Sequence, residues 1–234
     1  MQVTWYTYEQ TGQQAWIVGI GTITGNTITV TEAINTHGGI FGSAFNPADV
    51  VRETWDTIVM TFNACNNATV NYTGPALFGS GTLNLQRLAS ISGLDCNQGA
   101  STSESTSLAK ISGSWYDPSH NGEGYVIQIL ENNQAIVYWY TYDQSGNQTW
   151  ITGIGQVQGH KIIVDDTIFT EGGIFGSGFN PDSVLRKDWG SISFDFSSCN
   201  TGVASYQSTA GFGSGQLNLV RLTSIEDYRC ETLP

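Results

Sequence analysis

The sequence predicts an all-β protein made of two tandem antiparallel meanders, each curling into an up-and-down barrel, with a β-sandwich as the alternative. Three observations carry this prediction. The chain matches itself at an offset of 134 residues, short alternating runs lie between turn residues, and helical periodicity is missing apart from an expected single turn after each Phe-Asn-Pro triplet. A meander must hide its edge strands, and closure into a barrel does so most simply.

The duplication aligns residues 3–96 with residues 137–230 without a gap, and roughly half of the paired positions are identical. We divide the chain into a first repeat (1–96), a Ser/Thr-rich linker (97–110) with little to bury, and a second repeat (111–234). The opening part of the second repeat has no counterpart in the first copy, which starts later. We therefore expect the first repeat to lack its opening hairpin.

The second repeat is expected to contain eight strands in sequence order. The first two flank the turn DPSHNGEG, the third is the aromatic run IVYWYTY, and the others alternate apolar with polar residues between further turn signals. The expected strands are about 112–116, 124–130, 135–142, 148–156, 160–168, 190–197, 203–208 and 215–224.

The four cysteines predict one disulfide per repeat, because Cys65 and Cys96 are 31 residues apart, as are Cys199 and Cys230. Zinc sites need closer Cys and His spacing, so we expect no metal and no other cofactor. Disulfides persist in oxidising compartments, which indicates a secreted or periplasmic protein. No signal peptide stands before Gln2, and we expect that a leader has been removed.

The charge balance argues against polyanionic partners. The chain carries a net charge of −12 with a pI near 4.3, whereas nucleic acids and acidic membranes bind clustered Lys and Arg. No apolar run reaches the roughly 18 residues of a membrane-spanning helix. We expect neither nucleic-acid binding nor membrane insertion.

One turn gathers acid and base groups. Asp117, His120 and Glu123 lie within DPSHNGEG, where a histidine stands between two acids, and they are the candidate catalytic residues. The alternative is an ordinary solvated turn, since loops of Asp, Asn, Gly and Pro are common. No nucleophile elbow, phosphate-binding loop or metalloprotease motif is present.

Strand alternation places one charged residue among core-facing positions on each of several strands. Glu32 and Asp166 share a face with Ile and Val, and Arg87 and Arg221 share a face with the Leu residues of LNL. Unpaired buried charges are costly, so these residues either form an Arg–carboxylate pair that closes each barrel or bind a ligand.

Aromatic residues supply a further candidate surface. Tyr138, Tyr140 and Tyr142 share one face of a strand and Trp139 takes the other. Rings beside Asn, Gln and Asp suit sugars, so the tyrosines are either a glycan-binding strip or part of a core. The GGIFGS segments at 38–43 and 172–177 either relieve tight bends, bind an anion through their backbone N–H groups, or fold over a barrel mouth.

Two resemblances are visible. Gly113-Ser114-Trp115 together with Arg221 in LNLVRL resembles the avidin- and lipocalin-like barrels, which implies that the first-strand Trp packs beneath the last-strand Arg. The first repeat has Arg87 but no equivalent of Trp115. The phrases WYDPSHNGEGY and WYTYD…G…W resemble repeats of uncharacterised secreted proteobacterial proteins, which implies no activity.

These observations favour a secreted, non-enzymatic binding protein that takes glycans or small apolar ligands on aromatic surfaces or at a barrel mouth. A glycoside or ester hydrolase and a structural or adhesive module are the alternatives. The run Val3–Tyr8 is expected to be an edge strand that other residues must cover, because an uncharged aromatic edge favours aggregation. We therefore predict either contact between the repeats or self-association through this edge.

Overall fold

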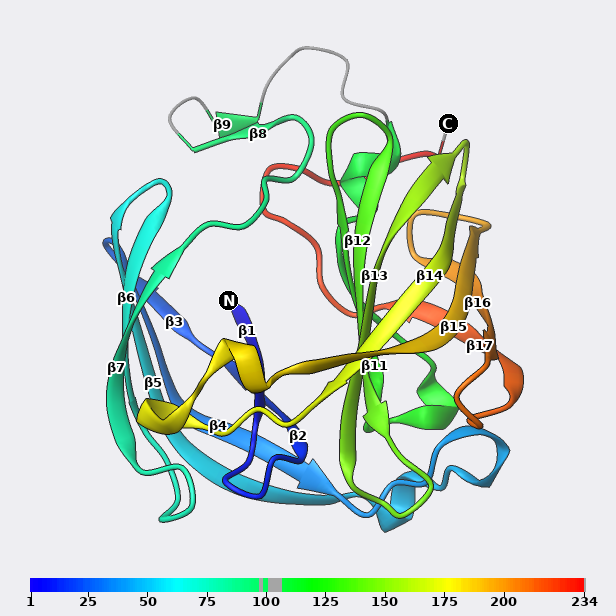
Figure 1. The fold of residues 1–234 in the computed structure, drawn as a ribbon. Helices are drawn as coiled ribbons and strands as arrows, with labels where there is room; N and C mark the ends of the chain where they lie inside the picture. The colour runs from blue at the N-terminus through cyan, green and yellow to red at the C-terminus, as the bar shows by residue number, and fades with distance from the viewer. Residues whose placement is uncertain (97–98, 101–106, 234) are drawn as a thin grey trace.

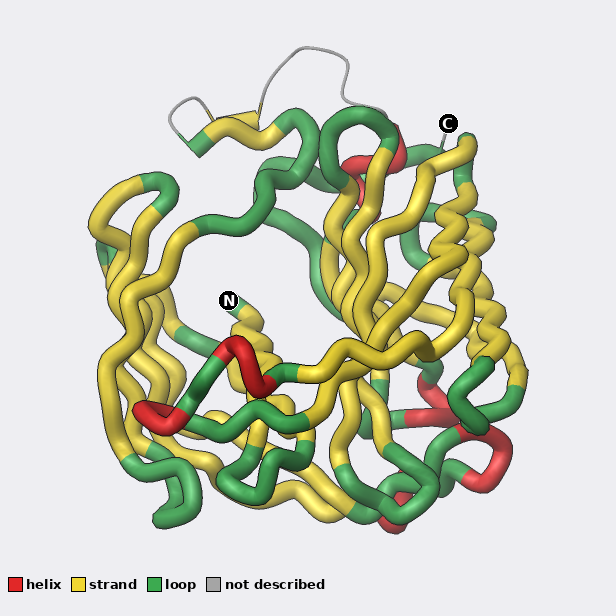
Figure 2. Tube along the Cα trace, viewed as in Figure 1, coloured by secondary structure: helices red, strands yellow, loops and turns green. Residues whose placement is uncertain are grey.

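The computed structural model describes the chain except for residues 97–98, 101–106 and 234. The described residues form an open sheet in the first repeat and a closed barrel in the second, as Figure 1 shows, with a short pair of strands between them. The helical segments of the described residues are short 3-10 segments of three to five residues (Figure 2). The predicted all-β class is confirmed.

The second repeat is a closed up-and-down barrel of eight antiparallel strands in which β10 also pairs with β17. The strands are β10 (Gly113–Tyr116), β11 (Gly124–Ile129), β12 (Gln134–Tyr142), β13 (Gln148–Gln158), β14 (Lys161–Glu171), β15 (Leu185–Phe196), β16 (Thr201–Ser208) and β17 (Ser214–Arg221). They follow the eight expected runs, and the barrel rather than the sandwich is the fold.

The first repeat forms a curled, open sheet. Its strands are β1 (Gln2–Tyr8), β2 (Gln14–Ile20), β3 (Thr22–Thr24), β4 (Thr27–His37), β5 (Val51–Ala64), β6 (Asn67–Thr73) and β7 (Ser80–Gln86). The order is β1-β2-β4-β5-β6-β7, with β3 paired to β4, and no described strand joins β1 to β7. The expected absence of the opening hairpin is confirmed.

The 3-10 turns include the one expected after each Phe-Asn-Pro triplet. These are η2 (Pro47–Asp49) and η6 (Pro181–Ser183), each begun by an Asn side chain that accepts a backbone hydrogen bond of 3.1 Å. The others are η1 (Gly42–Ala44), η3 (Ser107–Ile111), η4 (Pro118–His120) and η5 (Gly176–Gly178).

The expected linker contains part of the barrel core. Leu108 and Ala109 on η3 are fully buried against the barrel. The strands β8 (Leu94–Asp95) and β9 (Gly99–Ala100) pair across its start, and most of its remaining residues lie outside the described part of the chain. The barrel unit therefore begins before residue 111.

Both predicted disulfides are present, Cys65–Cys96 and Cys199–Cys230, each with Cα atoms 5.6 Å apart. Two such bonds are consistent with an extracytoplasmic protein.

The described residues contain no helical segment with the length and hydrophobicity of a membrane span.

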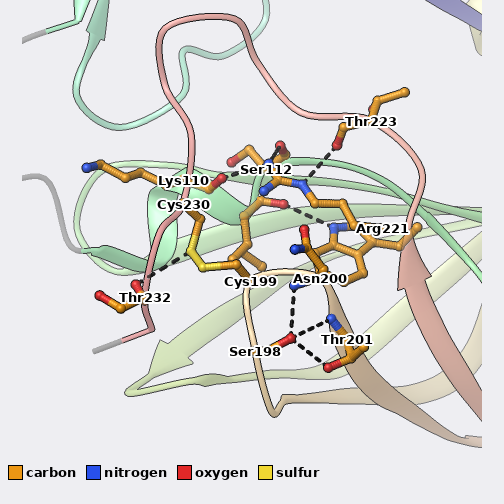
Figure 3. The surroundings of a disulfide bond; sticks show 12 residues. Lys110, Ser112, Ser198, Cys199, Asn200, Thr201, Arg221, Thr223, Cys230 and Thr232 are labelled. Carbon is orange, nitrogen blue, oxygen red and sulfur yellow. Dashed lines mark hydrogen bonds between the residues drawn. A yellow bond between two sulfur atoms is a disulfide. The ribbon is translucent and has the colours of Figure 1, made fainter.

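Arg221 closes one end of the barrel beside the second disulfide (Figure 3). Its guanidinium carbon lies 5.8 Å from the Trp115 ring centroid, as expected for this pair. The guanidinium donates to the carbonyls of Lys110, Ser112 and Thr223 at 2.7–2.9 Å. The prediction of a carboxylate partner for Arg221 is wrong, because backbone carbonyl oxygens satisfy this partly buried cation.

The two repeats exchange loops. The loop between β4 and β5 carries Phe41 into the barrel of the second repeat, and the loop between β14 and β15 carries Phe175 into the first sheet (Figure 1). Phe41 lies 5.0 Å from Trp139 and Phe175 lies 5.2 Å from Trp5, measured between ring centroids. We call residues 38–46 and 172–180 the exchanged loops. Each repeat therefore completes the core of the other.

Candidate binding cleft between the repeats

The faces of β1, β2, β12 and β13 meet in an interface that has a pseudo-two-fold axis. Gln14 Nε2 donates to the carbonyl of Trp150 at 3.0 Å, and Gln148 Nε2 donates to the carbonyl of Trp16 at 2.9 Å. Gln148 and Trp16 are the copies of Gln14 and Trp150 at the offset of 134 residues, so the same contact is made once in each direction across the interface. Such reciprocal contacts are those of an isologous dimer, here within one chain.

Hydroxyl pairs continue the same symmetry. The Tyr8 hydroxyl lies 2.7 Å from Thr170 Oγ1, and the Tyr142 hydroxyl lies 2.6 Å from Thr36 Oγ1. Gly39 and Gly173 are needed here, because a Cβ atom would lie 2.4 Å from the Tyr142 ring or 2.3 Å from the Tyr8 ring. Contact between the repeats, expected from the Val3–Tyr8 strand, is extensive.

The tyrosine strip lies in this interface. Tyr140 and Tyr142 are buried, and desolvation raises the pKa of each to about 12, so both remain protonated at physiological pH. Tyr138 stacks on Tyr6 with ring centroids 4.8 Å apart. The strip is on the outer face of the barrel, opposite the buried Trp139, but the first repeat covers most of it.

The interface is asymmetric because the described strands of the first repeat include no counterpart of the β10–β11 hairpin. The turn of this hairpin covers Phe45, whose ring stacks on His120 at 4.8 Å, and leaves it 9% exposed. The equivalent Phe179 is 48% exposed. An open cleft therefore lies on the Phe179 side of the pseudo-two-fold axis, whereas the equivalent position on the Phe45 side is filled.

This cleft has a volume of about 780 Å³, which lies within the roughly 300–1,000 Å³ of small-molecule sites. Aromatic and aliphatic side chains dominate its walls, and two threonines and two charged residues add polar groups. The lining residues are Tyr8, Leu88, Ile136, Tyr138, Trp150, Thr152, Gly153, Ile154, Asp166, Ile168, Thr170, Phe179, Pro181, Val184 and Arg186.

The carboxylate of Asp166 lies in the cleft, although strand alternation predicted that it would face the core. Glu32 and Asp166 were expected to face the cores, but both are exposed. The register between β4 and β5 shifts at Val30/Ala33, and that between β14 and β15 shifts at Val164/Thr167. An extra residue at a β-bulge reverses the faces that follow, so Asp166 turns outward and lines the cleft.

The acid/base turn is held together by hydrogen bonds. His120 Nδ1 lies 2.7 Å from Glu123 Oε1, and Thr141 Oγ1 donates to Glu123 Oε2. The hydrogen bond with Glu123 raises the pKa of His120 although burial opposes this. Glu123 is almost fully buried, and its carboxylate joins His120 in the turn to Thr141 on β12.

Asp117 has a different role from its neighbours. Burial alone would raise its pKa, but hydrogen bonds from the Ser119 side chain and from the backbone of Ser119 and Asn218 outweigh burial and lower the pKa. Its carboxylate caps η4 and reaches β17 at 2.7 Å. The structure therefore brings His120 and Glu123 together and gives Asp117 separate partners in the turn.

The acid/base turn lies apart from the cleft. None of its three candidate residues lines the cleft, and His120 is covered by Phe45 on one face of its ring. A smaller cavity of about 240 Å³ includes His37 and Glu53, which form a half-exposed ion pair of 3.4 Å. Such exposed pairs are usual at protein surfaces.

Arg87 has no partner of the kind that Arg221 has. Its side chain is exposed and donates to Ser90 Oγ at 3.4 Å, so the expected burial of Arg87 among core residues is wrong. The reason is the open sheet, because no described strand that carries a Trp lies beside β7. Among the described residues, no group of three or more His, Cys, Asp or Glu side chains is placed to hold a metal ion.

Sequence reasoning missed Trp150, Phe179 and Ile154 as cleft residues. The repeat contained one usable signal, because the hairpin that covers Phe45 has no copy that would cover Phe179. The chain was compared with family models, with curated proteins and with solved structures, and none of them matches it.

Proposed function

We propose that the protein is a secreted, non-enzymatic binding protein whose ligand site is the cleft between the repeats. The observation that carries the proposal is the open apolar cleft of about 780 Å³ beside Trp150 and the half-exposed Phe179. Exposed apolar surface of this kind on an otherwise polar protein is commonly a binding site. Secretion is supported by the two disulfides.

The lining favours a small ligand with an extended apolar face and an anionic end. Ile136, Ile154 and Ile168 offer aliphatic walls, and Arg186 at the rim suits a carboxylate or sulfonate. A glycan is the second ligand class. Sugars stack on open ring faces, and one face of Tyr138 is taken by Tyr6, which makes the cleft less suited to them.

The test is a binding titration with dodecanoate as the apolar probe and with chito- and malto-oligosaccharides as the glycan probes. We expect saturable binding of dodecanoate that Ile154→Asp weakens about tenfold or more, because a charge would face the apolar tail. Ile20→Asp is the matched control, since Ile20 is the equivalent exposed residue on β2 and lies outside the cleft.

Oligosaccharide binding that is sensitive to Ile154→Asp would keep the binding role and change the ligand class. Equal binding by wild type and Ile154→Asp would remove the cleft as the site. The hydrolase alternative rests on the 2.7 Å contact between His120 and Glu123. Turnover of chromogenic esters or glycosides that Glu123→Gln abolishes without unfolding the protein would favour that alternative.

A further inference from the structure

The first repeat presents two strand edges that the second repeat uses for its opening hairpin. In the barrel, β11 pairs with β12, Tyr125 opposite Trp139, and β10 pairs with β17, Trp115 opposite Arg221. The strands equivalent to β12 and β17 are β1 and β7, and no described strand pairs with their outer edges. Unpaired edges are templates for strand addition.

The interior of the open sheet lacks the cover that the hairpin gives the barrel. Leu219 on β17 is 2% exposed, whereas the equivalent Leu85 on β7 is 40% exposed. Arg221 lies over the Trp115 ring, whereas the equivalent Arg87 is solvent-exposed. The exposed surface thus corresponds to the positions that β10 covers in the second repeat.

The outer surface shows the same correspondence. The β10–β11 turn rests on the first repeat: His120 stacks on Phe45, and Asn121 Oδ1 accepts from Arg52 at 3.3 Å. A Cβ on Gly122 would lie 2.8 Å from Val50, which shows how closely the turn approaches.

The residues equivalent to Phe45, Val50 and Arg52 are Phe179, Val184 and Arg186, and all three line the cleft. Val126 of β11 also packs against the buried cluster around Trp16, the residue equivalent to Trp150 in the cleft. The cleft and the two unpaired strand edges together correspond to the positions that the β10–β11 hairpin and its turn occupy on the other side of the pseudo-two-fold axis.

We propose that the first repeat binds a β-hairpin of another polypeptide, which adds strands to β1 and β7 and places its turn on Phe179 and Val184. The recognised pattern is that of residues 113–129: an aromatic residue that packs beneath Arg87, a Gly-rich turn, and a strand that alternates apolar and polar residues. Main-chain pairing supplies affinity and the side-chain positions supply specificity.

This interaction goes beyond the proposed function because it depends on strand edges that a small ligand does not use. The hairpin turn would occupy the part of the cleft near Phe179 and Val184. Binding of a hairpin and of a small ligand is therefore mutually exclusive.

The probe is a synthetic peptide with the sequence of residues 112–130, SGSWYDPSHNGEGYVIQIL, labelled with a fluorophore and added to the full chain. We expect saturable 1:1 binding by anisotropy, slower hydrogen exchange of the outer-edge amides of β1 and β7, and displacement of bound dodecanoate. A scrambled peptide of the same composition is the control. Absence of binding, or equal binding of the scrambled peptide, overturns the proposal.

Two variants separate this proposal from the proposed function. Leu85→Asp should weaken the peptide about tenfold or more and leave dodecanoate binding unchanged, because Leu85 faces the open sheet outside the cleft. Asn84→Asp, on the exposed outer face of β7, is the matched control and should not alter peptide binding. Circular dichroism checks that each variant folds.

Ile154→Asp should weaken dodecanoate binding and leave peptide binding unchanged. Ile20, its equivalent in the first repeat, is 73% exposed although a hairpin covers that side, so a docked hairpin should not contact Ile154. Peptide binding that survives Leu85→Asp, or strand edges that gain no protection, overturns the hairpin proposal while the cleft proposal stands. If dodecanoate does not bind but the peptide binds as expected, the cleft proposal is overturned and the hairpin proposal stands. A peptide-free dimer with exchanged β10–β11 hairpins would overturn the assignment to a separate polypeptide.

Discussion

Replacing Phe41 by Ala should strongly destabilise the protein, because the exchanged loop inserts this ring into the barrel of the other repeat. Phe41 is 2% exposed and contacts Trp139, Trp189, Tyr206 and Phe212 at centroid distances of 5.0–6.0 Å. A buried aromatic side chain removes about 150–200 Å² from water, which at about 25 cal/mol per Å² corresponds to roughly 4–5 kcal/mol. Measured Phe→Ala costs of about 3–5 kcal/mol agree with this range.

The assay is urea denaturation followed by far-UV circular dichroism, with disulfides intact. Ile40→Ala is the control, because Ile40 is the preceding residue in the same loop and is 37% exposed; we expect it to cost under about 1 kcal/mol. A Phe41→Ala cost as small as that of Ile40→Ala would refute the reasoning, since the ring would then contribute nothing to the barrel core.

Three further predictions follow from the same contacts. Gly173→Ala should lower the free energy of unfolding by about 1–3 kcal/mol by forcing a methyl group against the Tyr8 ring, and thermal melting would show this as a lower midpoint. The hydrogen bond with Glu123 raises the pKa of His120, so its stabilisation is complete below about pH 6.5 and is lost as pH rises through the raised pKa. Glu123→Gln should therefore cost more at pH 5.5 than at pH 9, and a constant cost would contradict the assignment. Reduction of each disulfide should cost roughly 3–4 kcal/mol, as judged from denaturation with and without dithiothreitol, and unchanged curves would contradict the expected cross-link.

Local patterns were sufficient to predict the barrel. Most of the runs alternate apolar and polar residues, one is a continuous aromatic run, and Asp, Asn, Gly and Pro separate them, so the number and order of strands followed from neighbouring residues. The disulfides followed from equal spacing in the two copies. The gap in the first repeat followed from the absence of a second copy of the DPSHNGEG hairpin.

Long-range contacts and local irregularities were not predictable from the same patterns. The alternation of two places Glu32 and Asp166 inward, and a single bulge in each strand reverses them. The partner of Phe41 is Trp139, about a hundred positions away, and nothing in GGIFGS indicates which core receives its ring. The tyrosine strip was correctly placed opposite Trp139, but its cover comes from the other repeat.

The most direct test of the cleft as the binding site compares the indole N–H signals of Trp150 and Trp16 during a dodecanoate titration followed by two-dimensional NMR. The two residues are equivalent, but Trp150 lines the open cleft and Trp16 lies in the cluster covered by the β10–β11 hairpin. We predict that dodecanoate shifts the Trp150 indole and the Thr152 amide and leaves Trp16 unchanged. Shifts centred on Trp16, or no shift of Trp150 at saturating dodecanoate, would contradict the assignment of the cleft.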